Sequence, residues 1–349
     1  MHVERPEPKW IEALAETLTL AHVQPGEIVA IASETQSRRL LVEVAEQALV
    51  RLGARPYHVV ALSPRAPGAI PLRSTGTSLA FADLGPAVEG LASASLIVDC
   101  TVEGLLHTRE RAALLARGAR IFMLSDEHPE VFDRLRPMPG LQDLCERGGQ
   151  LITGAKKMRV TSRAGSDLDI DLDGVLGRGS AGVADKPGRM GYWPAGMCVC
   201  NPRPGSVNGR LVLSPGDANL TFKRYVETPV TLVIEDDYVT RIEGSGLDAE
   251  LMRSYYAAWN DREAYAVSHL GWGMNPAARW DALTMYDRRD VNGTELRAFA
   301  GNFLYSTGAN EAAGRFTTCH FDIPMRNCTV ALDGDAVVTD GVLRDDLRL

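Results

Sequence analysis

The order of apolar segments in the first third of this 349-residue chain constrains its fold most strongly. Four short apolar runs have the length of buried strands, at 27–33, 56–62, 94–100 and 119–125. Three stretches with apolar residues at helical spacing precede or separate these runs, at 7–23, 36–52 and 108–117. Strands that alternate with helices predict a parallel sheet covered on both faces. We therefore expect an N-terminal α/β domain over residues 1–155.

The pattern changes after Gly154, where short alternating strands are separated by Gly and Pro turns. DLDIDLDG at 167–174 is typical, because Leu and Ile alternate with Asp and predict a strand with one buried and one hydrated face. One helix is expected to interrupt the strands, at 247–261. The sequence therefore predicts a β-rich α+β domain over 156–349, and an α/β fold for the whole chain.

A glycine motif in the second half imitates a dinucleotide-binding turn. Gly177, Gly179 and Gly182 spell G-x-G-x-x-G, which binds phosphate only between a strand and a helix. Pro187 and Gly188 follow and oppose a helix, so we expect a flexible loop here and no nucleotide site.

Charge and hydropathy narrow the classes of partner. The formal net charge of −8 disfavours nucleic acid, because binding phosphates needs clustered Lys and Arg. No segment approaches the roughly 20 apolar residues that span a bilayer, and the first residues lack the apolar core of a signal peptide. We expect a cytoplasmic protein with a small-molecule ligand. Several exposed sheet edges in the β-rich half favour a homo-oligomer.

The best candidate for a chemical site combines two of the seven histidines with a carboxylate. His320 and Asp322 lie two residues apart, and such residues project from one face of a strand. His269 precedes Gly271 and Gly273, which permit a tight turn. Two histidines and one carboxylate on ferrous iron leave positions for substrate and dioxygen, whereas zinc would use the same ligand types for hydrolysis. A hydrogen-bonded core histidine is the other interpretation.

Six segments resemble the 2,5-dihydroxypyridine 5,6-dioxygenase family of bacterial nicotinate and pyridine catabolism. They are GLLH at 104–107, RAGSD at 163–167, WPAG at 193–196, SHLGWGMNPAARW at 268–280, RAFAGNFLYSTG at 297–308 and CHFDIPMRNC at 319–328. The resemblance implies that His269, His320 and Asp322 bind Fe(II). It also implies that 2,5-dihydroxypyridine and dioxygen give N-formylmaleamate by ring cleavage between carbons 5 and 6.

The resemblance implies roles for three further residues. His107 matches a histidine that acts on the substrate as an acid or base, which suits a group that titrates near neutral pH. Ser306 matches a serine near the substrate. Tyr192 stands where the family has a histidine, so we expect it to contact the substrate and to affect which ring substituents are accepted.

The implied fold is related to that of thermophilic metallo-aminopeptidases, which bind two metal ions. Ligands of their second metal match Met197 and a position near Leu304 here, and neither side chain can coordinate a hard ion. The chain is therefore expected to keep one metal position. A mono- or dinuclear metallo-aminopeptidase or amidase is the alternative function, and a metal-free binding module of the same fold is a second alternative.

Overall fold

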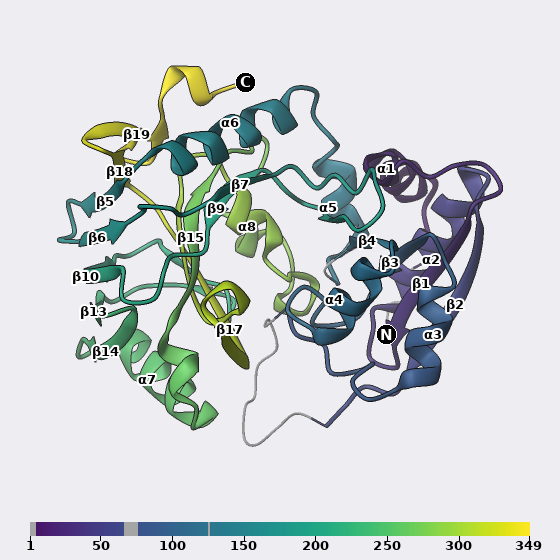
Figure 1. Ribbon diagram of the computed structural model, residues 1–349, viewed down its shortest axis with the longest axis horizontal. Helices are drawn as coiled ribbons and strands as arrows, with labels where there is room; N and C mark the ends of the chain where they lie inside the picture. Colours follow the sequence, from purple (N-terminus) through teal and green to yellow (C-terminus); the bar gives the residue numbers. More distant parts are fainter. Residues whose placement is uncertain (1–4, 66–75, 125) are drawn as a thin grey trace.

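The first half of the chain builds a parallel sheet, as predicted. The computed structural model describes residues 5–65, 76–124 and 126–349. The sheet has the strand order β2-β1-β3-β4-β8, and all its pairs are parallel. Figure 1 labels its strands β1 to β4. Its strands are β1 (Ile28–Glu34), β2 (Arg55–Ala61), β3 (Leu96–Asp99), β4 (Arg120–Met123) and β8 (Met190–Tyr192).

Helices cover both faces of this sheet because its central strands are apolar on both sides. The five helices are α1 (Pro8–Leu18), α2 (Arg39–Arg51), α3 (Gly85–Ala92), α4 (Arg109–Ala116) and α5 (Pro129–Arg134). Val29 and Ile31 of β1 pack in one core with residues of α1 and α2. Ala30 and Ala32 point to the opposite face, where they pack with residues of α3 and α4. Burial on both sides of the strand is the arrangement expected for a parallel sheet.

The second half is β-rich, as predicted, and forms two antiparallel sheets. One has the order β14-β13-β10-β6-β5-β18-β19-β20, with strands β5 (Lys157–Ser162), β6 (Asp167–Asp171), β10 (Val207–Leu213), β13 (Val230–Glu235), β14 (Tyr238–Glu243), β18 (Cys328–Leu332), β19 (Asp335–Thr339) and β20 (Val342–Leu343). The other has the order β17-β16-β15-β9-β7, with strands β7 (Gly177–Ser180), β9 (Met197–Cys200), β15 (Val267–Gly273), β16 (Phe303–Asn310) and β17 (Arg315–Met325).

Smaller elements complete this half. A two-stranded ladder pairs β11 (Ala218–Asn219) with β12 (Arg224–Tyr225), and this half contains the α-helices α7 (Leu247–Trp259) and α8 (Thr294–Ala298). Helix α6 (Leu141–Gly154) directly precedes it. In Figure 1, α8 lies between the strands of the second half and the helices of the first. Within the described residues, no helix combines the length and apolar character needed to cross a bilayer.

The two halves exchange elements across the predicted boundary. Strand β8 comes from the second half but pairs with β4 at the edge of the first sheet. Helix α6 precedes residue 155 but packs against β7 of the second half, where Gly149 and Gly177 come into close contact. A division into domains at residue 155 therefore stays a prediction, and each half depends on a segment from the other.

Two glycines of the motif, Gly177 and Gly179, lie in a strand, where the predicted loop is wrong, whereas residues 181–189 form no helix or strand. Gly177–Ser180 is β7, the edge strand that pairs with β9. A Cβ atom on Gly177 would lie 2.2 Å from the Gly149 carbonyl oxygen, and one on Gly179 would lie 2.3 Å from the Cys145 carbonyl. Gly177 and Gly179 are thus explained by close packing of a strand on α6, which the local sequence pattern does not reveal.

Candidate metal centre

Three adjacent strands bring the predicted metal ligands together. His269 lies on β15, while His320 and Asp322 lie on β17, and β16 runs between them. Their ligand atoms all lie within 4.8 Å of one another, and no other group of His, Cys, Asp and Glu in the described parts of the chain meets this criterion. His320 and Asp322 are each only 3% exposed. The predicted triad is therefore a compact, buried cluster.

The spacing of the three donor atoms suits one metal ion. The Nε2 atom of His320 lies 3.1 Å from Oδ1 of Asp322, and Nε2 of His269 lies 3.7 Å from the same oxygen. With bonds of about 2.1 Å, adjacent ligands of an octahedral ion lie about 3 Å apart. Each imidazole thus directs its own Nε2 atom toward Oδ1 of Asp322, as ligands of a shared ion would.

Ser306 fixes the tautomer of His269. This serine lies opposite Asp322 in the pairing of β16 with β17, and its hydroxyl donates a hydrogen bond to Oδ1 of Asp322. Its oxygen lies 3.1 Å from Nδ1 of His269. Because the single hydroxyl proton goes to the carboxylate, Nδ1 must be the donor to Ser306. Nε2 of His269 therefore carries a lone pair, as a metal ligand requires.

The charge states also suit metal binding. Burial lowers the pKa of His269 to about 3, so its imidazole is neutral at pH 7. Burial raises the pKa of the Asp322 carboxyl, but the neighbouring His320 and Arg297 side chains outweigh this effect and hold the pKa well below its usual value. Nε of Arg297 donates to Oδ2 of Asp322 at 2.5 Å, which leaves Oδ1 facing the two histidines.

His107 approaches the cluster from the first sheet. It lies between β3 and α4, and its ring centroid is 4.4 Å from that of His320. Its buried Nε2 has no hydrogen-bond partner among the described residues. The cap of α4 is Thr108, whose side chain accepts from the Arg111 amide, so His107 is not needed there. Burial, together with His320, holds the pKa of His107 well below its usual value, and the imidazole is neutral.

Two cavities meet at the cluster. The inner one, of about 70 Å³, is lined by His269, His320 and Asp322 together with first-half residues such as Met123. The outer one, of about 450 Å³, is lined by His107 and by polar residues of both halves. They share four lining residues, which are Leu106, Tyr192, Met197 and His269. A small ring could therefore approach the three ligands between the two halves of the chain.

Comparison with known proteins identifies the family. The family model described as 2,5-dihydroxypyridine 5,6-dioxygenase matches residues 9–345. The 2,5-dihydroxypyridine 5,6-dioxygenase of Pseudomonas putida KT2440 is 38% identical over 329 residues, which cover 93% of each chain. This chain belongs to the 2,5-dihydroxypyridine 5,6-dioxygenase family. The resemblance predicted from the six sequence segments is confirmed.

Solved structures agree with the family assignment. The structure of the 2,5-dihydroxypyridine dioxygenase from Pseudomonas putida KT2440 superposes with a TM-score of 0.89 at 35% identity, covering 98% of this chain and 100% of that one. AmpT from Thermus thermophilus superposes with a TM-score of 0.61 at 15% identity, covering 96% and 99%. The second likeness shows that the fold is shared, in keeping with the predicted relation to the aminopeptidase group.

The structure places the remaining candidate residues of this family member as follows. Tyr192, at the end of β8, lines both cavities, and burial raises the pKa of its phenol. Met197 and Leu304 line the inner cavity, where they present a thioether and an isobutyl group beside the cluster. Ser306 is fully buried and bonds to two of the clustered side chains, so its observed contacts are with the predicted ligands.

Sequence reasoning assigned no role to Arg297. This residue begins the RAFAGN segment that helped to carry the resemblance, so a signal was present. Its contact with Asp322 depends on the position of α8 relative to β17, which no local pattern reveals. Asn292 and Thr294, which also line the inner cavity, were missed for the same reason.

Proposed function

We propose that this chain is an Fe(II)-dependent 2,5-dihydroxypyridine 5,6-dioxygenase that converts 2,5-dihydroxypyridine and dioxygen to N-formylmaleamate. The observation that carries the proposal is the convergence of His269, His320 and Asp322 beside Nε2 of His107, which has no hydrogen-bond partner within the described residues. The family assignment supplies the reaction, because the Pseudomonas putida relative bears this name. The residues supply a site of matching chemistry.

The donor set fits ferrous iron. Two neutral imidazoles and one carboxylate are the ligands that non-haem Fe(II) oxygenases use, and three ligands leave further positions open. When bound, iron would supply coordination positions for a substrate oxygen and for dioxygen. Asp322 contributes the single negative charge among the three ligands, which is less than the double positive charge of Fe(II). The centre would therefore stay positive and attract an anionic substrate oxygen.

We assign the acid–base role to His107. Its neutral imidazole can accept a proton at Nε2, the atom without a partner among the described residues. Removal of the proton from the 5-hydroxyl group of the substrate would make the ring more electron-rich and its oxygen a better ligand. Leu106 and Met197 line both cavities and place apolar side chains beside this step.

Tyr192 and Ser306 support the proposal in different ways. Tyr192 lies where the two cavities meet, so its phenol would face a ring bound beside His269. We propose that it restricts the substituents of the substrate. Ser306 was predicted to lie near the substrate. Its two hydrogen bonds support a positioning role for it behind His269 and Asp322.

The experiment that tests the function compares metals and reactions on one preparation. The purified protein is stripped with a chelator, then restored with Fe(II), Zn(II) or Mn(II) and given 2,5-dihydroxypyridine under air. We expect oxygen uptake and N-formylmaleamate only with Fe(II). Peptide or amide hydrolysis restored by zinc or manganese, without oxygen uptake, would establish the hydrolase alternative.

Two further expectations belong to this proposal. We propose that the protein acts in the cytoplasm, where small aromatic substrates would reach it, and that it assembles as a homo-oligomer through its exposed sheet edges. Light scattering of the purified chain measures the second directly, because a monomeric mass of 37.8 kDa would contradict it.

A further inference from the structure

One short segment of the second half forms a wall of the inner cavity and holds a predicted ligand. Asn292, Thr294 and Arg297 line this cavity together with His320 and Asp322. Arg297 lies on α8 and donates to Oδ2 of Asp322. A displacement of α8 would therefore move the guanidinium that orients the Asp322 carboxylate.

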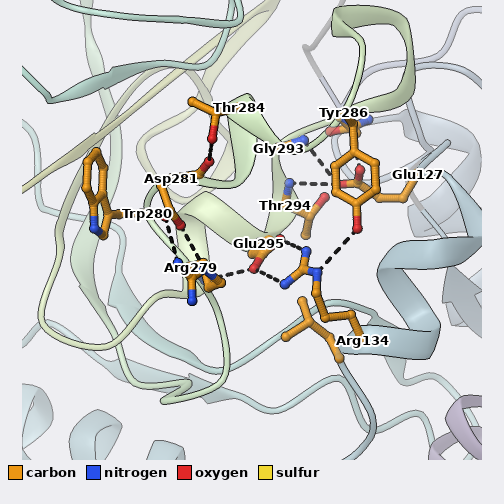
Figure 2. A network of polar contacts seen from close by, with 12 residues as sticks. Glu127, Arg134, Arg279, Trp280, Asp281, Thr284, Tyr286, Gly293, Thr294 and Glu295 are labelled. Atoms are coloured by element: carbon orange, nitrogen blue, oxygen red, sulfur yellow. Dashed lines mark hydrogen bonds and ion pairs between the residues drawn. The ribbon is translucent and has the colours of Figure 1, made fainter.

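The N-terminal end of α8 is held by a carboxylate from the first half. Glu127 follows β4 in the sequence, and its side chain is 1% exposed. One of its oxygens accepts hydrogen bonds from the backbone amides of Gly293 and Thr294, at 3.0 and 2.9 Å. The other accepts from the amide of Asn292 at 2.9 Å. Figure 2 shows this carboxylate beside the start of the helix.

A second residue of the first half holds α8 from its side. Arg134 of α5 forms a bidentate ion pair with Glu295, in which Nη1 of the arginine lies 2.7 Å from Oε1 of the glutamate (Figure 2). Glu295 also accepts a hydrogen bond from the Arg279 amide at 2.7 Å. Bidentate pairs between Arg and carboxylate fix orientation as well as distance. Glu127 and Arg134 thus hold the same helix at two points.

We propose that Glu127 and Arg134 are positioning residues of the metal centre, which act through α8 and Arg297 on Asp322. The inference rests on the proposed function, since it requires that Asp322 binds a metal ion. A carboxylate is suited to the role of Glu127 because both of its oxygens accept, and they serve three amides at once. A glutamine would turn an NH₂ group toward one of these amides and lose at least one hydrogen bond.

Cobalt(II) provides a readout that does not depend on turnover. Its dissociation constant is measured by competition with a chelator, and its visible spectrum reports the coordination geometry. We expect Glu127→Gln to weaken cobalt binding about 10-fold and to change the spectrum, because a displaced Arg297 would no longer serve as the outer partner of Asp322. Values within twofold of the unmodified protein, with an unchanged spectrum, would overturn the proposal.

Asp248→Asn is the matched control. Asp248 is 3% exposed and accepts hydrogen bonds from the backbone amides of Glu227 and Thr228. It lies in the first turn of α7 and does not hold α8. We expect this variant to lose thermal stability and to keep the cobalt affinity and spectrum. A loss of affinity equal to that of Glu127→Gln would show a general effect of removing a buried carboxylate, and would overturn the proposed path.

A double-mutant cycle tests whether the effect passes through Arg297. If it does, Glu127→Gln changes cobalt affinity less than twofold in an Arg297→Gln background, since the contact it positions is already gone. Independent, additive effects would overturn this route. Should Glu127→Gln not fold, Arg134→Gln removes the other support of α8, and an unchanged dissociation constant there would overturn the proposal. If the unmodified protein binds neither cobalt nor iron, the proposed function fails as well.

Discussion

Ser306 and Asp322 face each other across β16 and β17, and the serine hydroxyl donates to the carboxylate oxygen that both clustered histidines approach. The same hydroxyl accepts a hydrogen bond from His269. One small side chain therefore sets the orientation of two of the three predicted ligands. Outer contacts of this kind govern metal affinity, because they limit the rotation of the ligands.

Replacement of Ser306 by Ala should weaken Fe(II) binding about 10-fold, because His269 and Asp322 lose their shared partner. The dissociation constant is measured by chelator competition. Ser268→Ala is a suitable control, since Ser268 is also fully buried but bonds to the Ala309 carbonyl. Equal losses in the two variants would mean that the effect comes from the strands and not from the ligands.

Replacement of His107 by Gln should lower kcat about 10²- to 10⁴-fold, the usual contribution of a general acid or base. The iron content should stay unchanged, because His107 is not one of the three clustered donors. Metal analysis and oxygen uptake on the same sample measure both quantities. His58→Gln, on β2 and away from both cavities, should keep full activity. Loss of iron from the His107 variant would contradict its assigned role.

The metal content should reach one ion per chain and no more. Met197 and Leu304 occupy the wall where the predicted second set of ligands would lie, and neither offers a hard donor. Elemental analysis after loading with excess Fe(II) and gel filtration gives the ratio. A ratio of two, with binding isotherms that show two sites, would contradict the loss of the second position.

Asp126 should make the folded protein less stable as the pH rises. Burial raises the pKa of its carboxyl to about 7, and Glu127 adds to this effect. The nearby Arg38 and Lys223 act in the opposite direction and do not offset it. The folded state then keeps a proton that the unfolded chain releases near pH 4, so stability from this group falls between about pH 4 and 7.

Asp126→Asn should therefore raise the free energy of unfolding by up to about 4 kcal/mol at pH 8 and change it little at pH 4. Asparagine keeps the oxygen that accepts the Arg38 amide and tolerates the left-handed backbone, with φ of 49°. Urea unfolding at the two pH values measures the effect. A variant that is equally destabilised at both would show that Asp126 is ionised and needed in the folded state.

Sequence reasoning located most of the parallel sheet because β1 to β4 are local apolar runs separated by helical periodicity. It also placed His320 and Asp322 on one face, since that relation needs only two adjacent positions of a strand. It missed β8, which is only three residues long and joins a sheet built mainly by residues far earlier in the chain. Such a pairing depends on tertiary contacts and leaves no periodic pattern.

The same limit applies around the metal centre. The segment that forms β7 was predicted to be a loop because its glycines are explained only by contact with α6, which is formed by an earlier segment of the chain. No sequence pattern indicated a role for Glu127, because a carboxylate after a strand is common. Its role depends on contacts with the start of α8, which only the folded structure shows. Interactions between the halves that no motif marked, such as those of Glu127 with the start of α8, could not be predicted from the sequence.

The place of β8 at the edge of the first sheet has a consequence for synthesis of the chain on the ribosome. When residue 155 has left the exit tunnel, β4 still presents an unpaired edge, because Met190–Tyr192 has not yet emerged from it. An uncovered strand edge invites pairing with another chain. The edge of β4 therefore stays open in the nascent polypeptide until the strand bearing Tyr192 arrives, so the pairing of β4 and the completion of the cavity wall happen in one event.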